Sequence, residues 1–127
     1  MVAGLGIDMI EVERVKQYIE KDAGFREMTF SMHEIEYCET KANRFEYYAA
    51  RFAAKEAFFK ALGTGWVDGT NFNEIEIRHD ENSKPGIRLL AETKQTIAAL
   101  GITKILVSLS HLKTFATAVV IVEKTGE

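Results

Sequence analysis

The sequence is poor in several residue types, and each shortage excludes a class of protein. Its 127 residues include one cysteine, Cys38, and one proline. A single thiol excludes an internal disulfide and a zinc site with several thiolate ligands, so we expect Cys38 to be a small buried residue. The formal net charge is only −3, whereas general nucleic-acid binders usually carry a strongly basic face. We therefore expect no nucleic-acid partner.

Long apolar runs and a basic leader are also missing. No run approaches the ~18 apolar residues of a membrane span, and the first ten residues carry no basic residue and include Asp8, unlike a signal peptide. We therefore expect a cytoplasmic protein without a membrane partner. Apolar residues make up 46% and charged residues 28% of the chain, as in ordinary globular proteins. The length predicts one domain, residues 1–127.

The segment 2–10 alternates between large apolar residues and small or acidic ones, which predicts a strand. One face of this strand carries Leu5, Ile7 and Met9, and the other carries Gly4, Gly6 and Asp8. The second face has no side chains at its two glycines and ends at the carboxylate of Asp8. It therefore leaves room for another element or a ligand.

The remaining patterns predict an α+β fold, with helices packed on a mostly antiparallel sheet. Helical spacing and end signals predict helices over about 12–24, from Ser31 with a capping box to Glu34, over 43–62, and over 93–100. Strands are expected around 72–77, shortly after a turn at 80–86, around 105–109, and over 115–123. The last two strands are close enough in sequence to form a hairpin.

Glu56 is the most informative anomaly in the long helix. Since a helix turns about 100° per residue, Glu56 falls about 40° from Phe52, inside an apolar stripe. A carboxylate that faces a core is unfavourable unless it is paired or bound to a metal. Lys60, at i+4, offers an ordinary ion pair, so a structural reading of Glu56 stays open.

The same helix carries three cations along one flank, Arg44, Arg51 and Lys55. A solvated charged face is the ordinary interpretation. However, no acidic residue stands four positions from Arg51, and unpaired cations near a buried carboxylate suit a ligand with several phosphates. Thr64, between two glycines, would let the backbone approach such a ligand closely.

Asp8 is the candidate partner of Glu56, although it is also an ordinary polar residue for the end of a strand. Two carboxylates together with substrate phosphates suit Mg²⁺, which prefers oxygen ligands and keeps several waters. The residues alone therefore indicate a magnesium and polyphosphate site as one hypothesis beside the two structural ones.

Two segments resemble motifs of the holo-acyl-carrier-protein synthases, the short 4′-phosphopantetheinyl transferases. The segment 6–14 (GIDMIEVER) is similar to the first motif of that family, and 51–65 (RFAAKEAFFKALGTG) is similar to the second, longer motif. The segment 108–111 (SLSH) resembles a third, weaker block. The length and the motif spacing of the whole chain also fit the family.

The resemblance implies an activity and assigns roles to residues. The family moves 4′-phosphopantetheine from coenzyme A to a serine of apo-acyl carrier protein and releases adenosine 3′,5′-bisphosphate, with Mg²⁺. It implies that Asp8 and Glu56 hold the metal, that Glu56 and Lys60 are catalytic, and that Lys60 lies beside the pyrophosphate. Coenzyme phosphates would contact Arg44, Arg51, Lys55, Lys60, Gly63, Thr64 and His111. Short members form homotrimers with active sites between subunits, and fatty-acid synthesis is the default pathway.

The chain departs from the family at two places. Ser83 stands where the family usually has glycine before Lys-Pro, which changes the expected turn. The segment 112–115 (LKTF) differs from the more polar stretch expected after the histidine, so His111 also has an ordinary interpretation as a turn residue.

An acidic carrier protein needs a docking surface of its own. Arg14 and Lys21 share one face of the first predicted helix with Tyr18, and Phe25 and Arg26 follow. These five residues match the docking helix of the family, although a solvated helix face remains the alternative.

Two other functions fit parts of this pattern. A magnesium-dependent hydrolase of coenzyme A would use the same metal and phosphate groups but would have no need of the docking face. A non-catalytic carrier-binding module would have no need of Asp8, Glu56 and Lys60.

Overall fold

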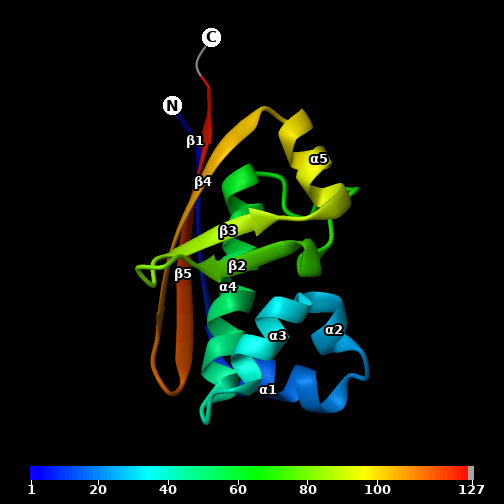
Figure 1. The fold of residues 1–127 in the computed structure, drawn as a ribbon, viewed down its shortest axis with the longest axis vertical. Coiled ribbons are helices and arrows are strands. Elements are labelled where there is room, and N and C mark those ends of the chain that lie inside the picture. The colour runs from blue at the N-terminus through cyan, green and yellow to red at the C-terminus, as the bar shows by residue number, and fades with distance from the viewer. Residues whose placement is uncertain (126–127) are drawn as a thin grey trace.

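The computed structural model describes residues 1–125 and has an α+β architecture (Figure 1). The elements in chain order are β1 (Val2–Glu11), α1 (Val12–Lys21), α2 (Phe25–Thr29), α3 (Met32–Glu39), α4 (Arg44–Leu62), a 3₁₀ turn (Phe72–Glu74), β2 (Ile75–His79), β3 (Pro85–Leu89), α5 (Ala91–Ala99), β4 (Ile102–His111) and β5 (Phe115–Lys124). All strand pairs are antiparallel. The predicted fold class and the final hairpin are confirmed.

Three features differ from the prediction. The first residues of the strand expected around 72–77 form the 3₁₀ turn Phe72–Glu74, and the strand itself is Ile75–His79. The strands form two sheets, one in the order β1-β5-β4 and one of β2 and β3. The short helix α2 was not predicted, because its five residues are too few to display a helical period.

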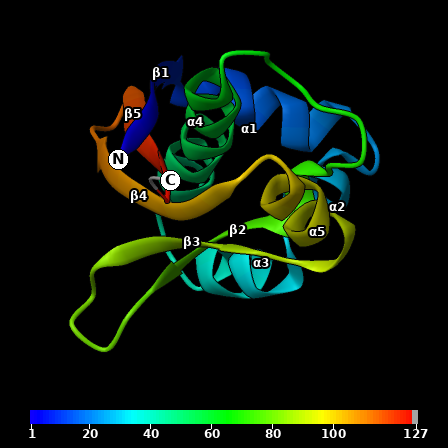
Figure 2. The same cartoon turned by 90° about the horizontal axis from the view of Figure 1, so that it is seen from above.

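Helix α4 lies at the centre of the molecule. Figures 1 and 2 show it against one face of the three-stranded sheet, with the small helices and the β2–β3 ribbon around its other sides. The residues of α4 that are buried are largely alanines and phenylalanines. Small side chains on this helix let it approach the sheet closely, which fixes the position of everything carried by α4 relative to β1.

The bare face of β1 is explained by this close approach. A Cβ on Gly6 would stand 2.0 Å from the carbonyl oxygen of Ala57, and one on Gly4 would stand 1.8 Å from that of Ala61. Glycine is therefore required at both positions. Asp8, the next residue on this face, consequently lies beside α4.

The opposite face of the same sheet is exposed. Leu5, Ile7 and Met9 are each at least 60% exposed, although their large apolar side chains alternate regularly along β1. The register places Leu5 beside Ile121 and Ile121 beside Leu106, so the apolar surface continues across the sheet. An apolar surface of this extent usually marks an interaction site.

The loop between β2 and β3 explains the departure at Ser83. Ser83 has a φ of 62°, which is the left-handed region that favours glycine. The turn therefore keeps the conformation that glycine suits, with serine in its place.

Within residues 1–125, no helix combines the length and the apolar composition needed to cross a membrane.

Candidate active site

Asp8 and Glu56 are brought together where β1 passes α4. Lys60 lies between them and the solvent, with its Nζ 3.0 Å from Asp8 Oδ1 and 3.1 Å from the carbonyl oxygen of Ile7. The Asp8 side chain is 16% exposed, whereas the Lys60 side chain is 55% exposed. Lys60 therefore pairs with Asp8, and the expected alternative, an i+4 ion pair between Lys60 and Glu56, is not formed.

The protonation of Glu56 depends on its burial and on the charges of Asp8 and Lys60. Burial raises the pKa of Glu56, and the neighbouring charge of Asp8 raises it further, while Lys60 opposes the shift. No hydrogen bond within residues 1–125 contributes to the shift. Two carboxylates thus share one partly buried place with a single cation, an arrangement that stability alone does not favour.

A divalent magnesium ion fits this pair of side chains. Asp8 and Glu56 supply carboxylate oxygens, the ligand type that Mg²⁺ prefers, and one or two protein carboxylates are typical for an ion that also binds substrate phosphates. No cluster of three or more histidine, cysteine or acidic residues suited to a metal occurs in residues 1–125. Two carboxylates, without a thiolate or imidazole beside them in the described part of the chain, are a donor set that suits magnesium better than zinc.

A second polar site surrounds Arg51. The Arg51 side chain is buried, with the residue only 2% exposed, and its Nε has no hydrogen-bond partner within residues 1–125. Its Nη1 donates a long hydrogen bond of 3.5 Å to the carbonyl oxygen of Tyr47. The hollow beside it, of about 240 Å³, is lined by Tyr47, Ala50, Arg51, His79, Ser83, Pro85, Leu109 and His111. We call it the Arg51 pocket. A buried cation with an unused donor suits an anionic ligand.

The family resemblance assigned both Arg51 and His111 to coenzyme phosphates, and the structure brings both to the Arg51 pocket. His111 is held by Glu46, with its Nδ1 2.9 Å from Glu46 Oε1, and its ring lies 5.0 Å from that of Tyr47. Its Nδ1 is therefore engaged, which leaves Nε2 for a ligand. His79 also lines this pocket but was not predicted, because a histidine at the end of a strand carries no recognisable motif.

The carboxylate pair and the Arg51 pocket lie on different flanks of α4. Arg51 and Glu56 are five positions apart, which separates them by about 140° around the helix. Asp8 belongs to β1 and His111 to β4, and β5 lies between these two strands. The two strands are thus about 10 Å apart across the sheet. Within one chain, the two sites face different directions.

The prediction for Lys55 was wrong. Lys55 is completely buried, with its Nζ 2.8 Å from Glu34 Oε1 and 2.8 Å from the carbonyl oxygen of Phe72, and it also donates to the carbonyl oxygen of Ile75. Burial lowers the pKa of Lys55, while Glu34 opposes this shift. With all its donors used inside the protein, Lys55 has none available for coenzyme phosphates.

Glu34 completes this buried network. It forms the predicted capping box with Ser31, and its second oxygen accepts a hydrogen bond of 2.9 Å from the backbone N–H of Ile77. The pair of Glu34 and Lys55 thus ties α3 and α4 to β2. Its role is structural.

The other predicted phosphate contacts lie outside the Arg51 pocket. Arg44 pairs weakly with Glu39, at 3.7 Å, and its guanidinium lies 4.5 Å from the ring centre of Phe45. Gly63 ends α4 with a φ of 82°, and the exposed Thr64 follows it beside a separate hollow that Trp66 also lines. Contacts from these residues to a coenzyme stay predictions.

The predicted docking face is formed by α1 and the start of α2. Arg14 donates a hydrogen bond of 2.9 Å to the hydroxyl of Tyr18, and the ring of Tyr18 lies 5.3 Å from that of Phe25. Lys21 is exposed at the end of the helix. Arg26 forms ion pairs with Glu27 and Glu39 that neutralise much of its charge, and its contact with a carrier stays a prediction.

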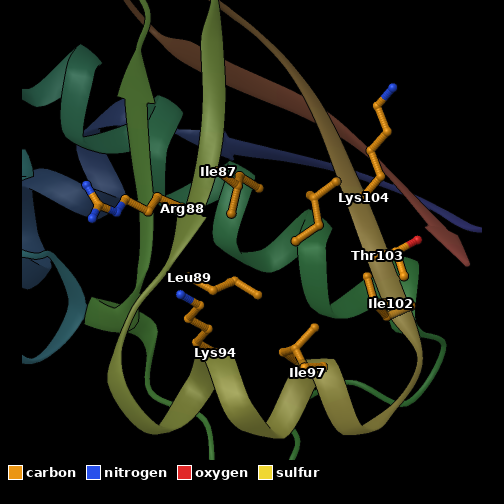
Figure 3. Close-up of a pocket in the computed structure, with 10 residues that line it drawn as sticks. Ile87, Arg88, Leu89, Lys94, Ile97, Ile102, Thr103 and Lys104 are labelled. Atoms are coloured by element: carbon orange, nitrogen blue, oxygen red, sulfur yellow. The ribbon is translucent and has the colours of Figure 1, made fainter.

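Another hollow, of about 360 Å³, lies between β3, α5 and β4. Figure 3 shows Ile87, Leu89 and Ile97 turned toward it, whereas Arg88 and Lys104 extend away from it. Its walls are therefore mainly apolar, and it lacks the converging cations of a phosphate site.

Known proteins resemble this chain over almost its whole length. Residues 4–120 match the 4′-phosphopantetheinyl transferase superfamily. A holo-[acyl-carrier-protein] synthase of Ruminiclostridium cellulolyticum is 48% identical over 120 residues, which cover 93% of this chain and 90% of that protein. The crystal structure of the Neisseria meningitidis holo-[acyl-carrier-protein] synthase is 30% identical and matches with a TM-score of 0.88, covering 98% of this chain and 100% of that one.

A further solved relative carries a ligand. The Bacillus anthracis holo-(acyl-carrier-protein) synthase, in complex with CoA (3′,5′-ADP), is 33% identical, with a TM-score of 0.79 and coverage of 98% and 99% of the two chains. With the motifs, the fold and these relatives in agreement, this chain belongs to the holo-[acyl-carrier-protein] synthase family within the 4′-phosphopantetheinyl transferase superfamily.

Proposed function

We propose that this chain, as a single transferase domain, moves 4′-phosphopantetheine from coenzyme A to a serine of an apo-acyl carrier protein and releases adenosine 3′,5′-bisphosphate. The observation that carries the proposal is the pair of Asp8 and Glu56 beside Lys60, in a chain whose relatives are holo-[acyl-carrier-protein] synthases. The carrier is proposed to serve fatty-acid synthesis in the cytoplasm.

In this reaction the serine oxygen attacks the phosphorus joined to pantetheine, and the bond from that phosphorus to the oxygen of the adenosine bisphosphate breaks. Positioning and neutralisation of charge dominate such phosphoryl transfer. Asp8 and Glu56 would hold magnesium, which supplies positive charge to the pyrophosphate oxygens when it is bound. Lys60 is exposed enough to turn its ammonium group toward the leaving phosphate, where it can donate a charge-assisted hydrogen bond.

The Arg51 pocket is proposed to hold a phosphate at the adenosine end of coenzyme A. The support is the buried guanidinium with an unused Nε and the facing His111. Because the carboxylate pair lies on another flank of α4, a coenzyme held by both sites would contact two copies of the chain. Together with the homotrimer that the family resemblance implies, this leads us to propose an active site between neighbouring subunits of a trimer.

The exposed apolar face of β1 is the proposed trimer contact. Replacing Ile7 and Met9 together by serine should shift the chain from trimer to monomer, because apolar area buried between subunits stabilises them by ~25 cal/mol per Å². Light scattering during size-exclusion chromatography measures the mass. A native chain that is monomeric and fully active at micromolar concentration would refute the shared active site.

The docking face on α1 should act on the carrier alone. Replacing Arg14 by alanine should raise the apparent KM for the carrier several-fold, with little change in the KM for coenzyme A. This effect should shrink as salt rises, since a charge at an interface rim mainly steers association and is screened beyond ~8 Å. Steady-state kinetics at low and high salt provide the measurement. Equal weakening of both substrates would place α1 in the coenzyme site instead.

Mass spectrometry of an apo-carrier incubated with the protein, coenzyme A and Mg²⁺ tests the function directly. Transfer adds the mass of phosphopantetheine to the carrier serine. A coenzyme A hydrolase would instead release adenosine 3′,5′-bisphosphate without a carrier, and a carrier-binding module would do neither.

A further inference from the structure

The Arg51 pocket contains a histidine that the function proposed above does not use. His79 ends β2 and lines this pocket together with Arg51 and His111. Its ring stacks on Tyr37, with the ring centres 5.6 Å apart and the planes inclined by 29°. The guanidinium of Arg51 lies 4.6 Å from the centre of the same Tyr37 ring. One aromatic side chain thus contacts both groups and holds them beside one hollow.

Charged groups from several elements surround His79. Arg51 on α4, Lys41 before α4 and His33 on α3 are positive or can become so, whereas Asp80 in the following turn is negative. Burial lowers the pKa of His79, the Arg51 charge lowers it further, and Asp80 opposes the shift. The unliganded ring is therefore neutral near pH 7, since its ordinary pKa of about 6.5 is already below that value.

A phosphomonoester bound in the Arg51 pocket would raise the pKa of His79, which the unliganded surroundings lower. It carries nearly two negative charges at neutral pH, with a second pKa of about 6, and it would stand beside the cation that disfavours protonation of His79. The bound anion therefore raises the pKa of His79, and the protonated ring gains a charge-assisted contact. By linkage, such binding takes up a proton and strengthens as the pH falls through the pKa of the bound state toward that of the free ring.

We propose that His79 is a specificity-determining residue of the Arg51 pocket, which takes up a proton when the 3′-phosphate of coenzyme A binds and makes recognition of this phosphate pH-dependent. The inference rests on the proposed function, because it takes coenzyme A as the ligand. It adds a residue at the end of β2 to the groups that distinguish coenzyme A from dephospho-coenzyme A.

Calorimetric binding of coenzyme A and of dephospho-coenzyme A, at about pH 6.5 and about pH 8, tests the proposal, because a histidine changes its charge over this range. For the native protein, the preference for coenzyme A should rise about three- to tenfold from the higher to the lower pH, because the bound ring keeps its proton over more of this range than the free ring does. Titrations in buffers of different ionisation enthalpy should show proton uptake with coenzyme A but not with the dephospho form.

Two variants of His79 separate charge from packing. His79→Gln should lose most of the pH dependence of the preference and most of the proton uptake, with the remainder coming from other groups of the pocket such as His111. His79→Lys keeps a positive charge at both pH values, so its preference for coenzyme A should be strong and nearly independent of pH. The control is Thr103→Ser, a neutral change in a different hollow, which should behave like the native protein.

The outcomes distinguish this inference from the function on which it rests. If His79→Gln keeps the native pH dependence, or if the native protein binds both coenzymes equally at both pH values, the role of His79 is refuted while transfer to the carrier can proceed. If the native protein binds neither coenzyme and transfers nothing, the proposed function fails, and the inference fails with it.

Discussion

Replacing Glu56 by glutamine is expected to lower the rate of transfer by about a hundredfold or more while the fold persists. Metal-assisted stabilisation of a phosphoryl transition state contributes several kcal/mol, and each ~1.4 kcal/mol corresponds to tenfold in rate. Asp8→Asn should behave alike. Because burial and Asp8 both disfavour the charge of Glu56, Glu56→Gln should unfold no more easily than the native protein. Asp8→Asn loses its ion pair with the largely exposed Lys60 and should cost less than about 1 kcal/mol.

Magnesium binding, measured by calorimetry, provides a readout besides turnover. The native protein should bind Mg²⁺ more weakly as the pH falls toward the raised pKa of Glu56, because the ion requires the carboxylates in their charged form. Both variants should bind it far more weakly at every pH. Near-native turnover of either variant at saturating Mg²⁺ would refute the metal assignment.

Replacing Lys55 by methionine is expected to destabilise the protein by about 3–5 kcal/mol, because it leaves the Glu34 carboxylate buried without its cation. Chemical denaturation measures this loss. Lys94→Met on α5 is the control, and it should change the stability by less than about 1 kcal/mol, since Lys94 is exposed and forms no ion pair within residues 1–125.

A double variant distinguishes the buried pair from general damage. Lys55→Met combined with Glu34→Gln should be destabilised by less than the sum of the two single changes, because no unpaired charge remains inside the protein. If Lys55→Met instead raised only the KM for coenzyme A and kept the native stability, the original assignment of Lys55 to the coenzyme would be restored.

Local patterns in the sequence were sufficient for several elements. The alternation of β1 follows from a period of two, the end of α4 follows from glycine in a left-handed conformation, and the capping box of Ser31 and Glu34 is a contact within one turn. These features depend on neighbours in sequence, which is why they could be predicted. The division into two sheets depends on which distant strands pair.

The residues of the candidate site also divide into those that the sequence indicated and those whose role only the structure revealed. The motif resemblance and the misplaced carboxylate indicated Asp8 and Glu56, and the structure brings both beside Lys60. Arg51 and Lys55 looked equivalent in sequence, because both are cations on one flank of α4. The structure separates them, since Lys55 meets Glu34 while the Nε of Arg51 meets no partner in residues 1–125.

Sequence patterns alone were enough for the strand and helix periods, the end of α4, the family and the carboxylates that a metal would need. Tertiary structure alone decided which cation is buried against an acid, that Lys60 pairs with Asp8, and that His79 joins the Arg51 pocket. The physical reason is range: propensity and capping act within a few residues, whereas pairing of charges and burial depend on groups that the chain brings together from distant positions.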